Sequence, residues 1–268
     1  MVTDRVVLVT GASSGFGKLT GSLLAQRGFR VFGTSRKVSA ESEDGVEMVR
    51  LDIASDQSVK ECVSSVHQKA DRIDVLINNA GQALTGGLEE TSVDEAKAHF
   101  DSNFFGAVRM VNAILPEMRR RRNGQIINVA SLAGTFPVPF EGYYGAAKAA
   151  LITYTEVLRQ EVKSLGVKVS VIEPGFFRTN LGNARITAAN SIPDYDEMRK
   201  RAHADLGKSF AKGADPAEVA ETIVKIIESP SPALHYFVGK EKNALLLKRI
   251  LPASVMEALI RKRWRLDG

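Results

Sequence analysis

The sequence predicts an α/β fold: a Rossmann-type, doubly wound, parallel seven-stranded sheet in a three-layer α/β/α arrangement. Short apolar, β-branched runs alternate with helix-length segments along the chain. The runs are apolar on both faces, which is typical of strands buried in a parallel sheet. Because parallel strands need crossover connections, we expect helices on both faces. The length of 268 residues suits a single domain, residues 1–268.

The expected strands share this apolar pattern and lie at residues 6–10, 30–34, 46–51, 73–78, 125–129, 167–172 and 234–238. Helical patterns cover residues 16–27, 57–69, 98–121 and 145–165, and Asp215-Pro216-Ala217-Glu218 is typical of a helix start. Residues 176–213 show no clear periodicity. A segment of that length in a compact domain is usually functional, so we expect a substrate loop or lid there.

Composition excludes several classes of protein. Hydrophobic residues make up 44% and charged residues 25%, which is ordinary for a globular chain. The one cysteine, Cys62, permits no intrachain disulfide, and its surroundings indicate a packing role. The first residues do not form a signal peptide, and no apolar run is long enough for a transmembrane helix. We therefore expect a cytoplasmic protein.

The formal charge of +5 is concentrated at one end of the chain. Residues 240–268 contain eight basic and three acidic side chains, so this segment accounts for the whole excess. Such a distribution argues against a nucleic-acid-binding surface. The four histidines, His67, His99, His203 and His235, lack ligand spacing, and no metal site is expected.

A glycine-rich turn follows the first expected strand. Residues 10–17 read TGASSGFG and open a helix. Glycines allow a tight turn close to a pyrophosphate, and the free N–H groups of the helix start favour an anion. This is the place of a dinucleotide in a βαβ unit. The predicted cofactor contacts here are Gly11, Ser13, Ser14, Gly15, Phe16 and Gly17.

The end of the second expected strand bears on the choice of nicotinamide cofactor. An acidic residue there would bind the adenosine ribose hydroxyls and repel a 2′-phosphate. The chain instead has Ser35, Arg36 and Lys37. The guanidinium of Arg36 suits a phosphate, so NADP(H) is favoured over NAD(H), with Ser35 and Arg36 as contacts. The alternative is that these are ordinary loop charges.

Tyr144 and Lys148 are candidates for acid–base chemistry. They are four residues apart on an expected helix and therefore share a face. A free tyrosine has a pKa of about 10, and a nearby ammonium would lower that pKa toward the useful range. Ser131 follows the fifth expected strand, where its hydroxyl could bind a substrate oxygen. The Tyr/Lys pair alone could also be structural.

With these motifs in order, the chain resembles the short-chain dehydrogenase/reductase family over about residues 6–238, and thirteen residues separate Ser131 from Tyr144 as in that family. The resemblance implies that Asn103, Ser131, Tyr144 and Lys148 are catalytic and that Lys148 also binds the cofactor ribose. It implies further cofactor contacts at Asp52, Ile53, Asn79, Ala80, Gly81, Tyr144, Pro174, Gly175 and Thr179. It also implies a homodimer or homotetramer, paired through the helices that hold Asn103 and Tyr144.

Apolar residues suggest a lipophilic substrate. They lie between Ser131 and Tyr144 and in the expected loop: Phe136, Val138, Phe140, Phe176, Phe177, Leu181, Ile186, Ile192, Tyr195 and Met198. Ordinary core packing is the alternative. The basic extension, residues 240–268, contains a predicted capping box at Ser254–Glu257 and an apolar helical face ending at Trp264. It could cover the substrate site, pack on a second subunit or make weak contact with an anionic membrane surface.

The sequence therefore predicts an NADP(H)-dependent oxidoreductase that acts on a lipophilic ketone, aldehyde or secondary alcohol. The extension makes the chain similar to the branch of 17β-hydroxysteroid dehydrogenases and retinol-type reductases. One alternative is a 3-ketoacyl-thioester reductase, against which the basic extension argues. Another is a non-catalytic NADP(H)-binding sensor, which would have no need of the acid–base residues.

Overall fold

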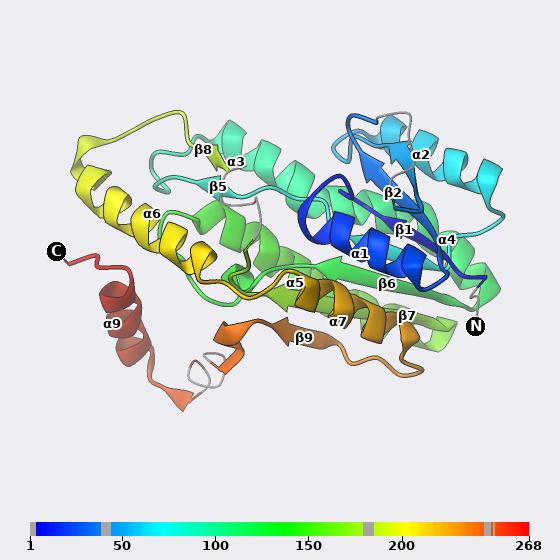
Figure 1. Cartoon of the computed structure of the whole chain (residues 1–268). Coiled ribbons are helices and arrows are strands. Elements are labelled where there is room, and N and C mark those ends of the chain that lie inside the picture. The colour runs from blue at the N-terminus through cyan, green and yellow to red at the C-terminus, as the bar shows by residue number, and fades with distance from the viewer. Residues whose placement is uncertain (1–3, 39–43, 179–184, 244–247, 249, 268) are drawn as a thin grey trace.

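The computed structural model describes residues 4–38, 44–178, 185–243, 248 and 250–267, and it contains a parallel seven-stranded sheet (Figure 1). The spatial order is β3-β2-β1-β4-β6-β7-β9. The strands are β1 (Val6–Val9), β2 (Arg30–Ser35), β3 (Val46–Arg50), β4 (Val75–Asn78), β6 (Gly124–Val129), β7 (Val167–Pro174) and β9 (His235–Val238). This is the order of a doubly wound dinucleotide-binding fold. The predicted fold class is confirmed.

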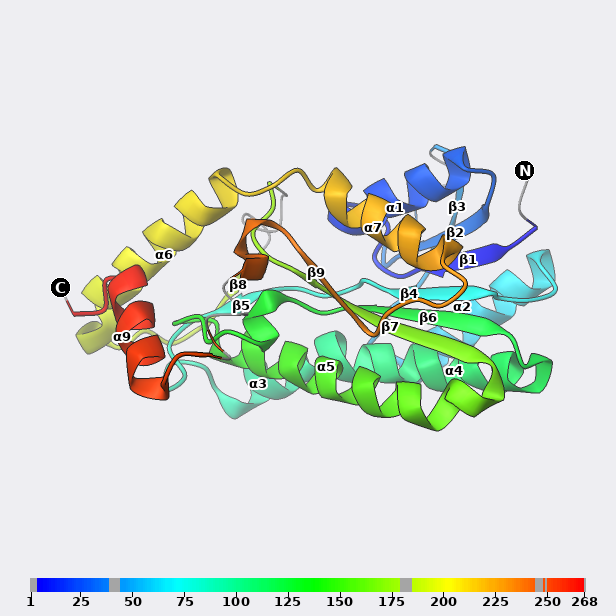
Figure 2. The ribbon, with the colours of Figure 1, turned by 90° about the horizontal axis from the view of Figure 1, so that it is seen from below.

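Helices cover both faces of the sheet, as Figure 2 shows. One layer holds α1 (Gly15–Gln26) and α7 (Ala217–Glu228), and the other holds α2 (Asp56–Lys69), α4 (Gly106–Arg121) and α5 (Gly142–Val162). Each helical layer packs against one face of the sheet and forms a separate apolar core with it. Strand residues with alternating orientation serve the two cores: Leu8 and Leu76 belong to one, and Val7 and Val75 to the other. Cys62 is buried in the first of these cores.

The sheet strands lie within two residues of their predicted ends, but two regions differ from the prediction in their helices. The expected helix 98–121 divides into α3 (Val93–Phe100), the π-helix η1 (Asp101–Phe105) and α4. The expected loop 176–213 contains the short η5 (Pro193–Tyr195) and the sixteen-residue helix α6 (Asp196–Ala211). Its strand β8 (Ile186–Thr187) pairs with β5 (Leu84–Thr85) in a separate small sheet. Short 3-10 turns occur at Leu132–Gly134, Lys163–Leu165 and Lys240–Asn243.

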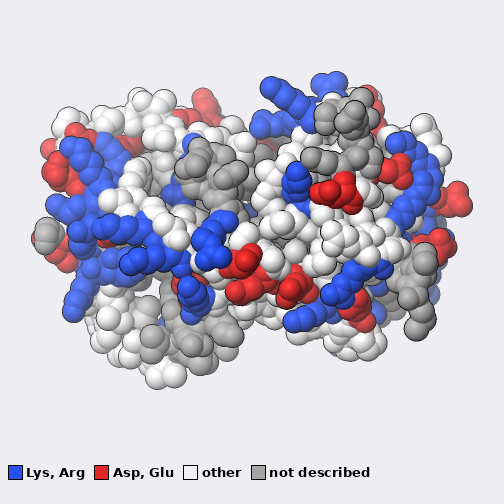
Figure 3. All heavy atoms as spheres, in the orientation of Figure 1, with Lys and Arg blue, Asp and Glu red and all other residues white. Residues whose placement is uncertain are grey.

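The C-terminal extension folds back over α6. Its helix α9 (Ala253–Arg263) begins after Pro252, which provides no side-chain cap, so the predicted capping box is wrong. Arg265 pairs with Asp205 of α6 at 2.7 Å, and Arg263 donates a hydrogen bond to Ser209 at 2.7 Å. Basic side chains gather over this end of the molecule in Figure 3. Two of the basic side chains of the extension, Arg263 and Arg265, therefore bind the C-terminal segment to α6.

No helix within the described ranges is long and apolar enough to cross a membrane.

The buried carboxylate of Asp74 lies at the amino ends of β1 and β4. Asp74 accepts a hydrogen bond from the backbone N–H of Val6 at 2.9 Å and pairs with Arg72 and Arg121. Burial acts to raise the pKa of Asp74, but the Val6 N–H and the two guanidinium groups outweigh it and hold that pKa below its ordinary value. The folded state is thus stabilised by the ionised carboxylate.

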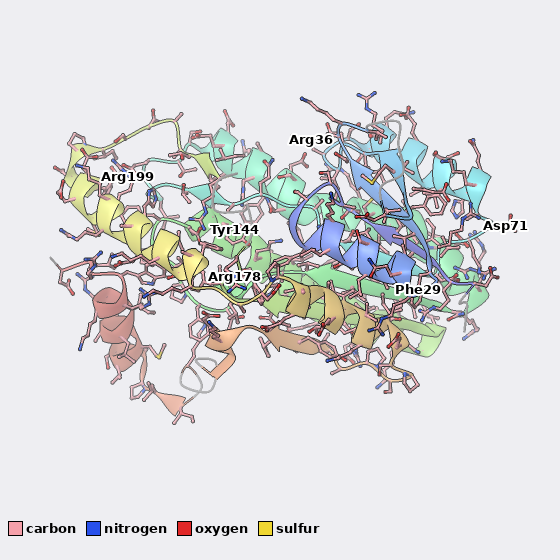
Figure 4. All side chains as sticks on the ribbon, in the orientation of Figure 1. Phe29, Arg36, Asp71, Tyr144, Arg178 and Arg199 are labelled. Atoms are coloured by element: carbon pink, nitrogen blue, oxygen red, sulfur yellow. The ribbon has the colours of Figure 1, made fainter. Side chains whose placement is uncertain are left out.

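Replacing Asp74 with asparagine should lower the free energy of unfolding by about 2 kcal/mol at neutral pH, because the buried carboxylate loses charge-assisted hydrogen bonds from two partly exposed guanidinium groups. Since the folded pKa is depressed, the contribution is present above the unfolded pKa of about 4 and is lost as the pH falls through the folded value. Urea unfolding at neutral pH and at about pH 3 tests this. The control is Asp71→Asn on the nearby surface (Figure 4), and equal stability of the two variants would contradict the account.

Candidate active site

The carboxyl ends of β1 and β4 lie where the strand order reverses, the usual place for a ligand in such a sheet. Gly11 follows β1 with φ +69°, and a side chain there would lie 2.9 Å from the Cα of Ala80. Gly17 packs under the same turn, where a Cβ would lie 2.3 Å from the carbonyl oxygen of Gly11. Asn79 donates to the carbonyl oxygens of Thr10 and Gly11 at 3.0 and 3.1 Å. The glycine-rich turn after β1 and the segment Asn79–Gly81 after β4, both predicted to contact the cofactor, are therefore in contact with each other.

The start of α1 is open, as an anion site requires. Ser14 is the N-cap residue but makes no side-chain capping hydrogen bond, and both Ser13 and Ser14 are exposed. A Cβ on Gly15 would meet no atom within 4 Å. Phe16 lines a pocket that also contains Ser131 and Tyr144, and it packs edge-on against Phe177. The free N–H groups and open space fit a pyrophosphate.

The predicted adenosine contacts lie at the ends of β2 and β3. Arg36 is exposed just beyond β2 (Figure 4), and within the described chain it takes part in no ion pair. Ser35 is half-buried and accepts the backbone N–H of Lys37 at 3.3 Å. Asp52 accepts the N–H of Ala54, whereas Ser55 caps α2. Arg36 is therefore available to a phosphate, and its role remains a prediction.

Ser131, Tyr144 and Lys148 meet at the carboxyl end of β6. Ser131 follows that strand, while Tyr144 and Lys148 stand one turn apart on α5. Tyr144 and Ser131 are joined by a side-chain hydrogen bond. Lys148 is buried, its Nζ donates to the carbonyl oxygen of Val129 at 2.9 Å, and it lies 5.9 Å from the centroid of the Tyr144 ring. The structure thus places the three residues as the sequence predicts.

Burial, and not the expected effect of Lys148, is the main cause that acts on the pKa of Tyr144. Burial raises the pKa of Tyr144 to about 12, and the charge of Glu141 adds to this effect. The hydrogen bond from Ser131 and the charge of Arg185 act in the opposite direction. Burial also lowers the pKa of Lys148 to about 8, so both groups are shifted toward their neutral forms.

Asn103 joins this cluster from the π-helix. Its Oδ1 accepts the backbone N–H of Gln82 at 3.1 Å, just beyond Gly81, and its Nδ2 donates to the carbonyl oxygen of His99 at 3.0 Å. The ring of His99 lies 6.1 Å from that of Tyr144. Burial lowers the pKa of His99 to about 4, with a smaller contribution from Lys148, so the ring is neutral. The widened helical turn brings Asn103 to this position, which regular helix periodicity does not indicate.

A pocket of about 330 Å³ opens beside Ser131 and Tyr144. Its lining confirms Phe136, Val138, Phe176 and Phe177 and adds Phe210 of α6. The tail contributes the face predicted to be apolar, namely Met256, Leu259, Ile260 and Trp264. Among described residues, Phe140, Ile186, Ile192, Tyr195 and Met198 are absent from this lining, and Leu181 lies outside the described residues. The tail therefore covers the pocket beside Ser131 and Tyr144, and its role there stays a prediction.

Three charged residues of the pocket escaped the sequence analysis: Glu141, Arg185 and Glu241. Glu141 precedes Tyr144 by three positions and would ordinarily be interpreted as a helix cap. Arg185 and Glu241 carry no local signal. Glu241 accepts the N–H of Phe176 at 3.4 Å, next to the predicted cofactor contacts Pro174 and Gly175. Thr179 and its predicted contact lie outside the described residues.

Within the described chain, no three His, Cys, Asp or Glu side chains gather where they could hold a metal ion.

Comparison with known proteins places the chain in a family. The short chain dehydrogenase family model matches residues 5–190. A 3-ketodihydrosphingosine reductase of Bacteroides thetaiotaomicron is 36% identical over 263 residues, 96% of this chain and 97% of that protein. A short-chain dehydrogenase structure from Streptomyces avermitilis has TM-score 0.83 and 30% identity, with 100% of this chain and 98% of that chain covered. A serine dehydrogenase complexed with NADP⁺ has TM-score 0.75 and 29% identity, with 88% and 94% covered.

The chain therefore belongs to the short-chain dehydrogenase/reductase family and is an oxidoreductase of that type. The resemblance predicted from the motifs is confirmed at this level. The narrower likeness to hydroxysteroid and retinol-type enzymes stays a prediction.

Two substitutions should move the pKa of Tyr144 in opposite directions. Ser131→Ala removes a hydrogen bond that lowers this pKa, and Glu141→Gln removes a charge that raises it. At about pH 10.5, where an ordinary tyrosine is mostly ionised, NMR of ring-labelled tyrosine should find Tyr144 protonated in the cofactor-free wild type. Glu141→Gln should increase ionisation and Ser131→Ala should not. A largely ionised wild-type Tyr144 at that pH would contradict the assignment of burial as the dominant cause.

Proposed function

We propose that the protein is an NADP(H)-dependent reductase of lipophilic ketones, with Tyr144 as the proton donor. The observation that carries the proposal is the opening of one largely apolar pocket onto both Ser131 and Tyr144. A carbonyl oxygen placed between these hydroxyls accepts a hydrogen bond from each. The dinucleotide supplies and accepts hydride when it is bound.

Each polar residue of the site has a separate role in the proposed reaction. Ser131 holds the substrate oxygen, and Tyr144 gives its proton to that oxygen as negative charge develops. The raised pKa of Tyr144 keeps the phenol protonated at neutral pH, which suits reduction of a carbonyl. Lys148 has a pKa of about 8 and is mostly an ammonium at neutral pH, able to bind ribose hydroxyls. Asn103 fixes the backbone beside Gly81 through the N–H of Gln82.

Several features support NADP(H) as the cofactor. The uncapped start of α1 and the close packing of Gly11 and Gly17 suit a pyrophosphate, and the exposed Arg36 suits a 2′-phosphate. A related serine dehydrogenase has been solved with NADP⁺. At the carboxyl ends of β2 and β3, near Arg36, the proposed adenosine site is completed by Ser35, Asp52 and Ile53.

The proposed substrate is lipid-like because of what α9 adds to the pocket. Its apolar face and Phe210 of α6 make the outer part of the lining hydrocarbon and aromatic. An alkyl chain or ring system gains free energy by leaving water there. The relative named as a 3-ketodihydrosphingosine reductase favours the same class of substrate. A steroid or retinoid remains compatible with such a lining.

Replacing Tyr144 with phenylalanine should reduce ketone turnover at least about a hundredfold, because the proton donor is lost while the ring is kept. The affinity for NADPH, measured by fluorescence titration, should stay close to that of the wild type. Tyr143→Phe is a matched control: the neighbouring hydroxyl lies outside the proposed machinery, and its loss should leave turnover intact. Full activity of Tyr144→Phe, or equal losses in both variants, would overturn the assignment.

A further inference from the structure

The substrate pocket contains a buried ion pair for which the reaction has no evident need. Arg185 and Glu141 pair at 3.2 Å between Nη2 and Oε1, and their side chains are 13% and 5% exposed. Both residues line the pocket beside Tyr144. Burying two charges costs free energy that their attraction often fails to recover, so this pair calls for an explanation.

The local chain does not use the carboxylate. Glu141 stands at the N-cap of α5, but its side chain makes no capping hydrogen bond. The guanidinium of Arg185 lies 4.5 Å from the ring centroid of Phe210, so a cation–π contact holds it in the pocket wall. The pair is therefore positioned by the pocket, with its polar atoms unused by the helix.

One acceptor and one donor of this pair remain without a hydrogen bond. Oε1 of Glu141 contacts Arg185 as an ion pair only, and Nε of Arg185 is buried; neither atom has a hydrogen-bond partner among the described residues. A hydroxyl group can donate to the first and accept from the second. A charged ligand group would instead satisfy one member and leave the other charge unpaired in an apolar site.

We propose that Glu141 and Arg185 form a hydroxyl-binding subsite, and that the substrate is a lipophilic hydroxyketone. This inference deepens the proposed reductase function and rests on it for the identity of the reacting carbonyl. Glu141 is the N-cap residue of α5, three positions before Tyr144, and the charges of Glu141 and Arg185 both act on the Tyr144 phenol. The hydroxyl therefore lies a few bonds from the carbonyl that Tyr144 and Ser131 hold.

Matched ligands test the subsite by binding. Trp264 is the one tryptophan of the chain and lines the pocket, so its fluorescence reports occupancy without turnover. With NADP⁺ present, the full-length protein is titrated with 1-hydroxydodecan-3-one, dodecan-3-one and 3-oxododecanoate. The wild type should bind the hydroxyketone about tenfold to a hundredfold more tightly than dodecan-3-one, because the simple ketone leaves the buried polar atoms unpaired.

The double variant Glu141→Met/Arg185→Met removes both charges together and avoids stranding either one, so it should fold. Its preference for the hydroxyketone should fall to about onefold, with dodecan-3-one bound at least as tightly as by the wild type. Leu259→Ala is the control: it shortens the apolar lining and should weaken both ketones alike.

Equal wild-type affinity for the two ketones, or a preference that survives in the double variant, overturns the subsite. Tighter binding of 3-oxododecanoate that Arg185→Met abolishes also overturns it, because Arg185 would then be an anion site. NADPH oxidation separates this inference from the proposed function. A hydroxyketone preference in binding without turnover contradicts the reductase alone, and equal turnover of both ketones contradicts the subsite alone.

Discussion

All seven strands of the central sheet run in one direction, and the position of the site follows from that constraint. The carboxyl ends of parallel strands meet at a single edge. The turn after β1, the Asn79–Gly81 segment after β4 and Ser131 after β6 are therefore neighbours although they are far apart in the chain. The helix α5 begins at the same edge, so Tyr144 and Lys148 in its first two turns lie there as well. A change in strand direction would scatter these groups.

Loss of water is the second determinant of the site. Burial raises the pKa of Tyr144 and lowers the pKa of Lys148 and His99, so the site favours neutral groups. The same exclusion of water makes unpaired polar atoms expensive. Glu141 and Arg185 nonetheless remain in the lining of this largely apolar pocket, where they pair with each other at 3.2 Å. Residues of α6 and α9 complete the lining.

The sequence predicted what depends on local pattern. Apolar runs located the sheet strands, and glycine spacing located the turn that packs against Ala80. It missed what depends on distant packing. Polar contacts such as the ion pair between Asp205 of α6 and Arg265 hold this helix in place. Because these contacts do not need an apolar face, the sequence of α6 shows no strong apolar periodicity. The partner of Glu141 is Arg185, forty-four positions away, and no local rule joins them. The pKa of Tyr144 was predicted from its neighbour Lys148, whereas burial decides it.

We propose that this pocket is the place where a lipophilic ketone is reduced with NADPH. The most direct test is the decrease in nicotinamide absorbance when the purified protein is mixed with NADPH or NADH and a panel of long-chain ketones, ketosteroids, retinal and acetoacetyl thioesters. We expect oxidation of NADPH in preference to NADH by a long-chain or cyclic lipophilic carbonyl, with little activity on short thioesters. Tight binding of NADPH with no oxidation by any member of the panel would contradict it and would favour a cofactor-binding role without turnover.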